Sequence, residues 1–275
     1  MNSGISEAFV TENGSDLEKA RLQYILYGSI PEQEVLESFT GLQNDDGGFP
    51  CGLVDHNPSS LDRTHLSLWW LEELGRLESP EVDRGMDYII RKQSGDGSWD
   101  EDPALTRHGL PPWVIPGDMP TRLYLTAYSA YWLGAAGRRG HPAFQKALDF
   151  LMEYQNNTGE FFGYLHTTWL ATSAFIMAGG QNTVTAKRGM QALMDRPLSE
   201  FVASQLAWML NCLNTAGLLK GHHAATHFLI KLRQLQRKDG SWASEDGDVH
   251  AVDSTIESLR ALKNFGLLPK SIPER

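Results

Sequence analysis

The sequence predicts an all-α protein built as an α/α toroid, in which an inner ring of helices is surrounded by an outer ring. Three observations support this prediction. A short phrase recurs four times, each copy directly follows an apolar amphipathic segment, and the segments between the copies alternate between two kinds of helix. A repeat that runs end to end through 275 residues favours one domain.

The recurring phrase consists of Gln, three polar or small residues, Gly, one residue and an aromatic ring. Its copies are QNDDGGF at Gln43, QSGDGSW at Gln93, QNNTGEF at Gln155 and QRKDGSW at Gln236. Glycine readily adopts the left-handed backbone that ends a helix, the Gln amide can bond groups freed at that end, and the ring can pack beneath the turn. Each copy is therefore expected to be a turn that closes one helix and leads into the next.

Helices of the first kind, called core helices here, are apolar nearly all round, which suits burial on both sides. They are expected at 16–27, 61–77, 121–136, 166–178, 200–216 and 249–265. Helices of the second kind, called cover helices, carry one apolar stripe and a charged back. They are expected at 31–42, 80–92, 142–154, 183–194 and 222–235.

The spacing of the copies decides the arrangement of these helices. The copies lie 50, 62 and 81 residues apart, and the last interval divides into two helix pairs around a degenerate copy, MDRPLSEF. Six core helices and five cover helices follow, so the sixth cover helix is missing or supplied by another element. A linear solenoid is the competing arrangement, although its exposed concave side would usually be more polar. Residues 1–14 are expected to be a flexible arm, and 15–275 a single toroid domain.

The composition limits which classes of binding partner and which cellular compartment are expected. The net charge of −10 argues against nucleic acid or an anionic membrane as the main partner. Two cysteines, Cys51 and Cys212, fit a reducing cytosol better than a disulfide framework. The start of the chain lacks a signal-peptide pattern and no apolar stretch is long enough to span a bilayer. We therefore expect a cytoplasmic protein, with peripheral membrane attachment left open.

Polar and aromatic residues recur at the starts of the core helices, which the turns should bring to one mouth of the toroid. Residues three or four positions apart lie on the same face of a helix, so four polar or aromatic faces are expected. They carry Asp62, His65 and Trp69; Tyr124 and Tyr128; His166 and Trp169; and His250, Asp253 and Glu257. Trp208 could extend the aromatic wall, and Arg63, Arg107 and Arg122 could hold a diphosphate. The long connection 98–120, rich in proline, is expected to form a lid over this mouth.

The recurring phrase is similar to the QW motif of terpenoid cyclases and to equivalent turns of protein prenyltransferase β subunits. The resemblance runs from about Asp16 to about Leu268 and implies the toroid fold. It also implies that an aromatic wall holds an isoprenoid and stabilises carbocations while an acid starts the reaction. VHAVDSTIESLRAL resembles the helix start that carries the DxDD acid motif, but the matching tetrad is His250, Ala251, Val252 and Asp253. Only its last Asp is retained, which puts protonation of the usual class II kind in doubt.

A second interpretation makes the same residues a metal site. Prenyltransferase β subunits bind zinc through Asp, Cys and His at core-helix starts, and the comparable residues here are Asp62, His65, His166, His250 and Asp253. The Cys of that family has no clear match, so a site of His and Asp with Zn²⁺ or Mg²⁺ would point to hydrolysis or lyase chemistry. Each of these residues also has a structural interpretation, as a helix cap or as core filling.

The sequence thus predicts a terpenoid cyclase-like or prenyltransferase-like enzyme acting on an isoprenoid or similarly apolar substrate. Its catalytic candidates are Asp62, His65, His166, His250 and Asp253, and its substrate-binding candidates are Arg63, Trp69, Arg122, Tyr124, Tyr128, Trp169 and Trp208. The alternatives are a metal-dependent hydrolase or lyase and a non-catalytic β-like subunit that needs a partner chain. A homo-oligomer is also left open.

Overall fold

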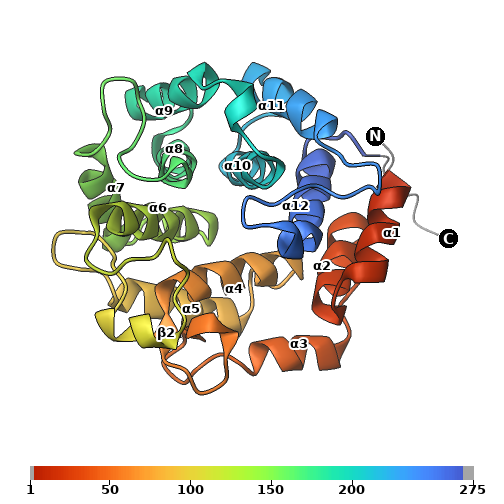
Figure 1. The fold of residues 1–275 in the computed structure, drawn as a ribbon. Helices are drawn as coiled ribbons and strands as arrows, with labels where there is room; N and C mark the ends of the chain where they lie inside the picture. Colours follow the sequence, from red (N-terminus) through yellow and green to blue (C-terminus); the bar gives the residue numbers. More distant parts are fainter. Residues whose placement is uncertain (1–2, 269–275) are drawn as a thin grey trace. The chain divides into compact units, whose positions relative to one another are not determined.

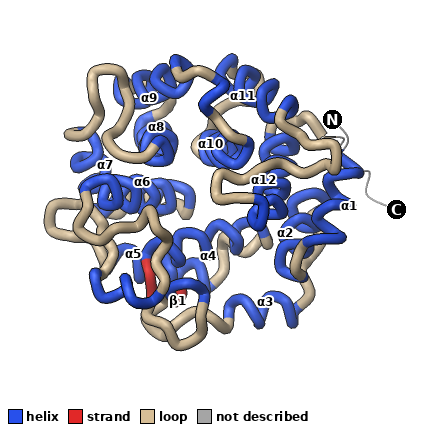
Figure 2. The backbone as a smooth tube through the Cα atoms, in the orientation of Figure 1, coloured by secondary structure: helices blue, strands red, loops and turns tan. Residues whose placement is uncertain are grey.

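The computed structural model describes residues 3–268. They are almost entirely helices and loops, and their only strands form one short antiparallel pair, β1 (Phe49–Pro50) and β2 (Ser59–Ser60) (Figure 2). The chain forms two compact units. The terminal unit comprises Met1–Leu36, Glu73–Gly75 and Met194–Arg275, and the middle unit comprises Glu37–Glu72 and Arg76–Leu193.

The predicted core helices are present, with ends shifted by a few residues. They are α2 (Asp16–Tyr27), α4 (Leu61–Glu73), α6 (Met119–Ala135), α8 (Leu165–Gly179), α10 (Ala203–Thr215) and α12 (Ala251–Asn264). Within the middle unit, α6 is buried at every position from Leu123 to Gly134, and α8 at every position from Thr167 to Met177. Burial on all sides explains why their sequences are apolar and small all round.

The cover helices are α3 (Gln33–Thr40), α5 (Pro80–Arg91), α7 (Pro142–Met152), α9 (Val184–Asp195) and α11 (His223–Gln234), with a further one at the N-terminus. In α7 only one face is buried, carried by residues such as Phe144, Leu148 and Leu151. Proline occupies the first turn of α5 and α7, where its missing N–H costs nothing.

The four repeated turns share one hydrogen-bond pattern. In each, the Gln side-chain amide donates to the carbonyl of the glycine four residues later, at 2.8 Å for Gln43, 3.0 Å for Gln93, 3.0 Å for Gln155 and 3.5 Å for Gln236. The backbone N–H of each aromatic residue donates to a threonine hydroxyl in the following core helix: Phe49 to Thr64, Trp99 to Thr126, Phe161 to Thr168 and Trp242 to Thr255. Each turn therefore ends a cover helix and fixes the start of the next core helix.

The same Gln amide ties each turn to the next cover helix. Gln43, Gln93 and Gln155 donate to carbonyls at the starts of α5, α7 and α9, namely those of Glu81, Ala143 and Thr185. The degenerate copy has no such Gln. It forms a short 3-10 turn, η3 (Leu198–Glu200), but retains the buried ring, because Phe201 packs on Phe228 of α11 at 5.7 Å between centroids.

The fourth turn is tied to the N-terminus. Gln236 donates to the hydroxyl of Ser6 at 2.8 Å, and that hydroxyl donates to the carbonyl of Gly240 at 2.6 Å. Ser6 belongs to α1 (Ser3–Asn13), which lies beside α2 and α12 in the terminal unit and buries Val10 (Figure 1). The predicted arm over 1–14 is therefore wrong for Ser3–Asn13, which supply the sixth cover helix; residues 1–2 lie outside the described range. The expected domain limits of 15–275, whose last residues 269–275 are likewise not described, stay a prediction.

Candidate active site

Aromatic rings from three core helices meet in the middle unit. His65 and Trp69 come from α4, Tyr124, Tyr128, Tyr131 and Trp132 from α6, and His166 and Trp169 from α8. We call these eight residues the aromatic cluster. They are linked by ring contacts such as His65–Tyr128 at 4.6 Å, Trp69–Tyr131 at 5.8 Å, Tyr124–His166 at 6.4 Å and His166–Trp169 at 4.5 Å between centroids. The structure thus brings together six of the predicted site residues.

Asp62 lies at the edge of this cluster, in the first turn of α4. The residue is 7% exposed, and its carboxylate accepts a hydrogen bond from the hydroxyl of Tyr124. Burial raises the pKa of Asp62 above its ordinary value, although Arg63 and the Tyr124 hydroxyl oppose the shift. Arg63 reaches Asp62 at 3.9 Å, which is long for a hydrogen-bonded ion pair. Asp62 is therefore a carboxyl group that gains a proton more readily than an exposed one.

His65 lies deeper on the same face of α4 and is fully buried. Its Nε2 atom lies 2.9 Å from the Ser129 hydroxyl, and its Nδ1 atom has no hydrogen-bond partner among residues 3–268. Burial lowers its pKa to about 3, so the imidazole is neutral at pH 7. A neutral imidazole with one unpaired nitrogen can accept or donate one further hydrogen bond, depending on its tautomer.

Arg122 does not join this cluster. Its guanidinium donates to Asp96 at 2.7 Å and to the hydroxyl of Ser98 at 2.6 Å, and it lies over the ring of Phe150 at 5.7 Å. Arg122 therefore braces the second repeated turn, and its role in binding substrate stays a prediction.

The remaining predicted residues belong to the terminal unit. His250 is the last residue of the 3-10 turn η4 (Asp248–His250), directly before α12, and is exposed. Asp253 follows in the first turn of α12, and its carboxylate accepts a hydrogen bond of 2.6 Å from Arg21 of α2. Trp208 is a partly exposed residue of α10. Asp253 is thus held in an ion pair rather than standing alone at the helix start.

The sequence analysis missed the charged side chains behind Asp253. Arg21 also bonds Glu73 at 2.7 Å, and Glu73 lies 3.3 Å from Arg260. Arg21 and Glu73 are each 1% exposed. A charge at a core-facing position of a helix was the available signal, because an arginine or glutamate is buried almost only when it is paired.

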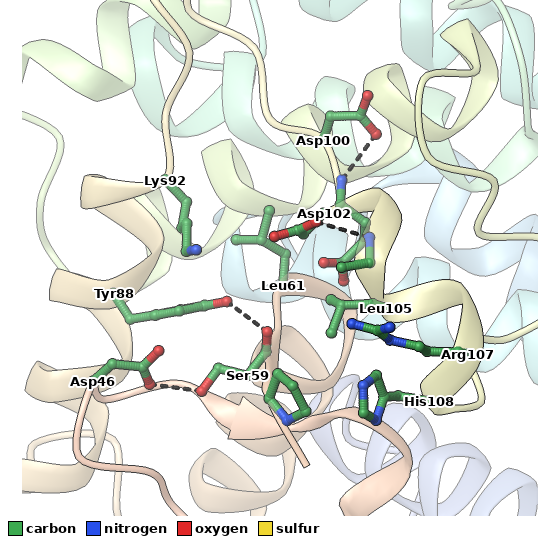
Figure 3. Close-up of a pocket in the computed structure, with 13 residues that line it drawn as sticks. Asp46, Ser59, Leu61, Tyr88, Lys92, Asp100, Asp102, Leu105, Arg107 and His108 are labelled. Atoms are coloured by element: carbon green, nitrogen blue, oxygen red, sulfur yellow. Dashed lines mark hydrogen bonds between the residues drawn. The ribbon is translucent and has the colours of Figure 1, made fainter.

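A separate pocket of about 200 Å³ opens between α5, the first repeated turn, the start of α4 and the long connection at 98–120 (Figure 3). Its wall includes Tyr88, Lys92, Asp100 and Arg107. Glu101 also lines the pocket, and its carboxylate accepts a hydrogen bond of 2.9 Å from the backbone N–H of Asp62. Burial raises the pKa of Glu101. Arg107, a predicted diphosphate-binding residue, lines this pocket.

The long connection lies against the loop at 52–60. His108 of the 3-10 turn η2 (Pro103–His108) lies 3.2 Å from the side-chain oxygen of Asn57. The hydroxyl of Tyr164, directly before α8, donates to the carbonyl of Trp113 at 2.7 Å. These two bonds hold the connection at the starts of α4 and α8.

The donor geometry does not fit a metal ion. Within residues 3–268, no three His, Cys, Asp or Glu side chains come close enough together to hold one. Asp253 is paired with Arg21, and the described contacts of His65 are to Ser129 and Tyr128. The five residues named as metal candidates from the sequence are therefore not gathered as ligands, and we derive no step through Zn²⁺ or Mg²⁺.

None of the helices between residues 3 and 268 is long and apolar enough to cross a lipid bilayer.

Comparison with known proteins identifies the fold. No protein-family model and no curated protein matches the chain. A protein from Actinoplanes matches with a TM-score of 0.60 and 19% identity, covering 91% of this chain and 90% of its own. The type II terpene cyclase MstE from Scytonema, in complex with merosterolic acid A, matches with a TM-score of 0.57 and 14% identity, covering 92% and 88%.

A third structure, ent-copalyl diphosphate synthase from Streptomyces platensis, matches with a TM-score of 0.58 and 17% identity, covering 91% of this chain and 50% of its own. At such identities the likeness establishes the fold and leaves the reaction to be argued from the site. The predicted fold class is confirmed: the chain has the all-α toroid fold of the type II terpene cyclases.

Proposed function

We propose that the chain is a terpenoid cyclase-like enzyme that binds an isoprenoid or similarly apolar substrate against the aromatic cluster. The observation that carries the proposal is the position of Asp62, a buried carboxyl bonded to Tyr124 at the edge of eight packed rings. The fold supports it, since MstE is described with the substrate geranylgeranyl dihydroxybenzoate and another neighbour is a copalyl diphosphate synthase.

The rings of the cluster supply what carbocation chemistry requires. The face of an indole or phenol ring attracts a cation, and the attraction is worth about 2 kcal/mol when water is excluded. Trp169 and Tyr131 are each 0% exposed, so bulk water does not reach them. A cation formed from an alkene would be stabilised there, whereas an exposed site would quench it with water.

The acid and the polar groups have distinct roles in this proposal. Asp62 protonates or orients the substrate, with Tyr124 fixing its carboxyl group, while neutral His65 offers its Nδ1 atom to a polar group of the substrate. His166, between Tyr124 and Trp169, lines the same face. His250 and Asp253 belong to the terminal unit, and their catalytic roles stay a prediction from the sequence.

The test is turnover of linear isoprenoids, measured as product formation by gas chromatography and mass spectrometry. Asp62→Asn should retain the fold and substrate binding but lose turnover at least about a hundredfold, the usual contribution of a general acid. Trp169→Leu should lower turnover by about thirtyfold through the lost cation–π term. Wild-type rates in both variants would overturn the proposal. Binding without turnover in the wild type would instead favour the non-catalytic subunit.

A further inference from the structure

The carboxylate of Glu101 contacts the start of α4 from outside that helix. Glu101 belongs to the long connection at 98–120 and is 4% exposed. Its Oε1 atom accepts a hydrogen bond of 2.9 Å from the backbone N–H of Asp62 and one of 2.5 Å from the hydroxyl of Ser60, the residue before α4. All three residues belong to the middle unit, so the contact lies within one compact part of the chain.

The start of α4 needs acceptors of this kind. The first N–H groups of a helix have no partner within the helix, and side-chain oxygens usually supply one. The Ser60 hydroxyl accepts from the N–H of Arg63 at 3.3 Å, while the N–H of Asp62 donates to Glu101. Because the Ser60 hydroxyl also donates to Glu101, one carboxylate oxygen holds both the capping residue and the first turn of the helix.

Glu101 is itself fixed by contacts of its neighbours. Trp99, two residues earlier, is fully buried, and its backbone N–H donates to the Thr126 hydroxyl of α6 at 2.9 Å. The carboxylate of Asp100 accepts from the N–H of Glu101 at 2.8 Å and from that of Gly117 at 2.9 Å. The two ends of the long connection are therefore joined beside Glu101, which gives its carboxylate a defined place.

The geometry of this first turn decides where the Asp62 carboxyl group lies. An aspartate side chain has one carbon between its backbone and its carboxyl group, so the carboxyl group follows any movement of the Cα atom. The Tyr124 hydroxyl restrains the carboxyl end of Asp62, and Glu101 restrains its backbone end. Asp62 is thus held from two sides at the edge of the aromatic cluster.

We propose that Glu101 is a positioning residue for Asp62, a role that rests on the proposed function. The described hydrogen bonds of Glu101 are to Ser60, Asp62 and Asp100, so it acts through the helix start and not on the rings of the cluster. It keeps the Asp62 carboxyl group at one place relative to those rings. A reacting group displaced by about 1 Å loses up to about a hundredfold in rate, so a contact away from the chemistry has a large effect. No proton or electron passes through Glu101 in this role.

Two substitutions of Glu101 separate its hydrogen bonds from its charge. Glu101→Ala removes a CH2 group and the carboxylate, which together match acetate in size and charge. Because Glu101 lines the pocket of about 200 Å³, acetate from solution can occupy the vacated place and accept the bonds of Ser60 and Asp62 again. Glu101→Gln keeps the shape and an oxygen that accepts both bonds, and it removes only the charge.

The experiment measures turnover of a linear isoprenoid in wild type, in both Glu101 variants and in Glu153→Ala, which changes an exposed glutamate of the middle unit outside the pocket. In Glu101→Ala kcat should fall at least about tenfold with KM unchanged, and acetate, but not chloride at equal ionic strength, should restore part of the loss. Glu101→Gln and Glu153→Ala should keep rates close to wild type. An unchanged kcat in Glu101→Ala, a loss confined to KM, or an equal loss in Glu101→Gln would overturn the positioning role.

Amide hydrogen exchange, followed by mass spectrometry at single residues, tests the contact without any turnover. The N–H of Asp62 should exchange faster in Glu101→Ala, slow again with acetate, and be unaltered in Glu153→Ala. Unchanged exchange in Glu101→Ala would contradict the contact itself. If wild type converts no isoprenoid while this exchange pattern holds, the proposed function fails and the contact stands. If wild type is active and Glu101→Ala is equally active, only the positioning role fails.

Discussion

Ser6 and Gln236 lie 230 positions apart in the sequence and are joined by a hydrogen bond of 2.8 Å. The Ser6 hydroxyl in turn donates a hydrogen bond to the carbonyl of Gly240, so the N-terminal helix is attached to the last repeated turn at two points. In the three other turns, the corresponding Gln amide reaches the start of the next cover helix along the chain. Helix α1 therefore occupies, at the fourth repeated turn, the position that α5, α7 and α9 occupy at the first, second and third turns.

Removal of this attachment should destabilise the terminal unit. Ser6→Ala deletes a buried hydroxyl that donates one bond and accepts another, and we expect a loss of about 2 kcal/mol in the free energy of unfolding. Deletion of residues 1–13 should lower the stability further, because it also uncovers the faces of α2 and α12 that α1 buries. Urea denaturation followed by circular dichroism measures both. Glu12→Gln, an exposed change in the same helix, should leave the midpoint unaltered, and equal midpoints for all variants would contradict the assignment of α1 as a cover helix.

The second repeated turn contains two glycines, and only one of them stands where a larger residue would clash. Gly97 has a φ of +92°, and a Cβ placed there would lie 2.4 Å from the carbonyl oxygen of Lys146, whereas a Cβ at Gly95 would meet nothing within 4 Å. Gly97→Ala should therefore cost about 2 kcal/mol or more through backbone strain and this clash. Gly95→Ala should lie within about 0.5 kcal/mol of wild type. Thermal and urea unfolding of the pair test this, and similar losses at both positions would show that the close approach to α7 is not what requires glycine.

The sequence predicted those features of the fold that depend on contacts between residues close together in the chain. The repeated turns could be read directly because Gln, Gly and the ring of each copy lie within seven residues, and their bonds are made there. The faces of the core helices followed from helical spacing, which placed Tyr124 near Tyr128 and Asp253 near Glu257 on the same faces.

Contacts between distant helices could not be read in this way. Arg21 meets Glu73 across 52 positions and Asp253 across 232, and no periodicity within one helix reports such a pairing. The arm expected at the N-terminus failed for the same reason. Its polar sequence carries a weak apolar stripe, and its place depends on Ser6 meeting a turn far along the chain.

Burial of His65 predicts a specific loss of stability in acid. Its folded-state pKa, about 3, lies below the value of about 6.5 for an unfolded histidine, so the unfolded state binds the proton first. The stabilisation is complete above pH 6.5, declines as the pH falls, and is lost near pH 3; over that interval it amounts to about 5 kcal/mol by linkage. Unfolding midpoints measured at several pH values should show a shallower decline in His65→Gln, whose amide can still bond Ser129. His223→Gln, at an exposed position, should follow the wild-type curve; a wild-type curve for His65→Gln as well would contradict the burial of the imidazole.

Replacement of Arg21, which bonds both Glu73 and Asp253, should cause a large loss of stability that a second substitution partly recovers. Arg21→Met removes the charge that compensates buried Glu73, and breaking a buried ion pair on one side costs about 3–5 kcal/mol. Glu73→Leu, combined with Arg21→Met, removes the uncompensated carboxylate as well and should recover part of that loss. A double-mutant cycle from urea unfolding isolates the interaction between the two. Lys19→Met on the same helix, which breaks only a surface pair with Asp16, should change stability by about 1 kcal/mol or less. Additive losses for Arg21 and Glu73 would show that the two side chains act independently and would contradict their pairing in the folded protein.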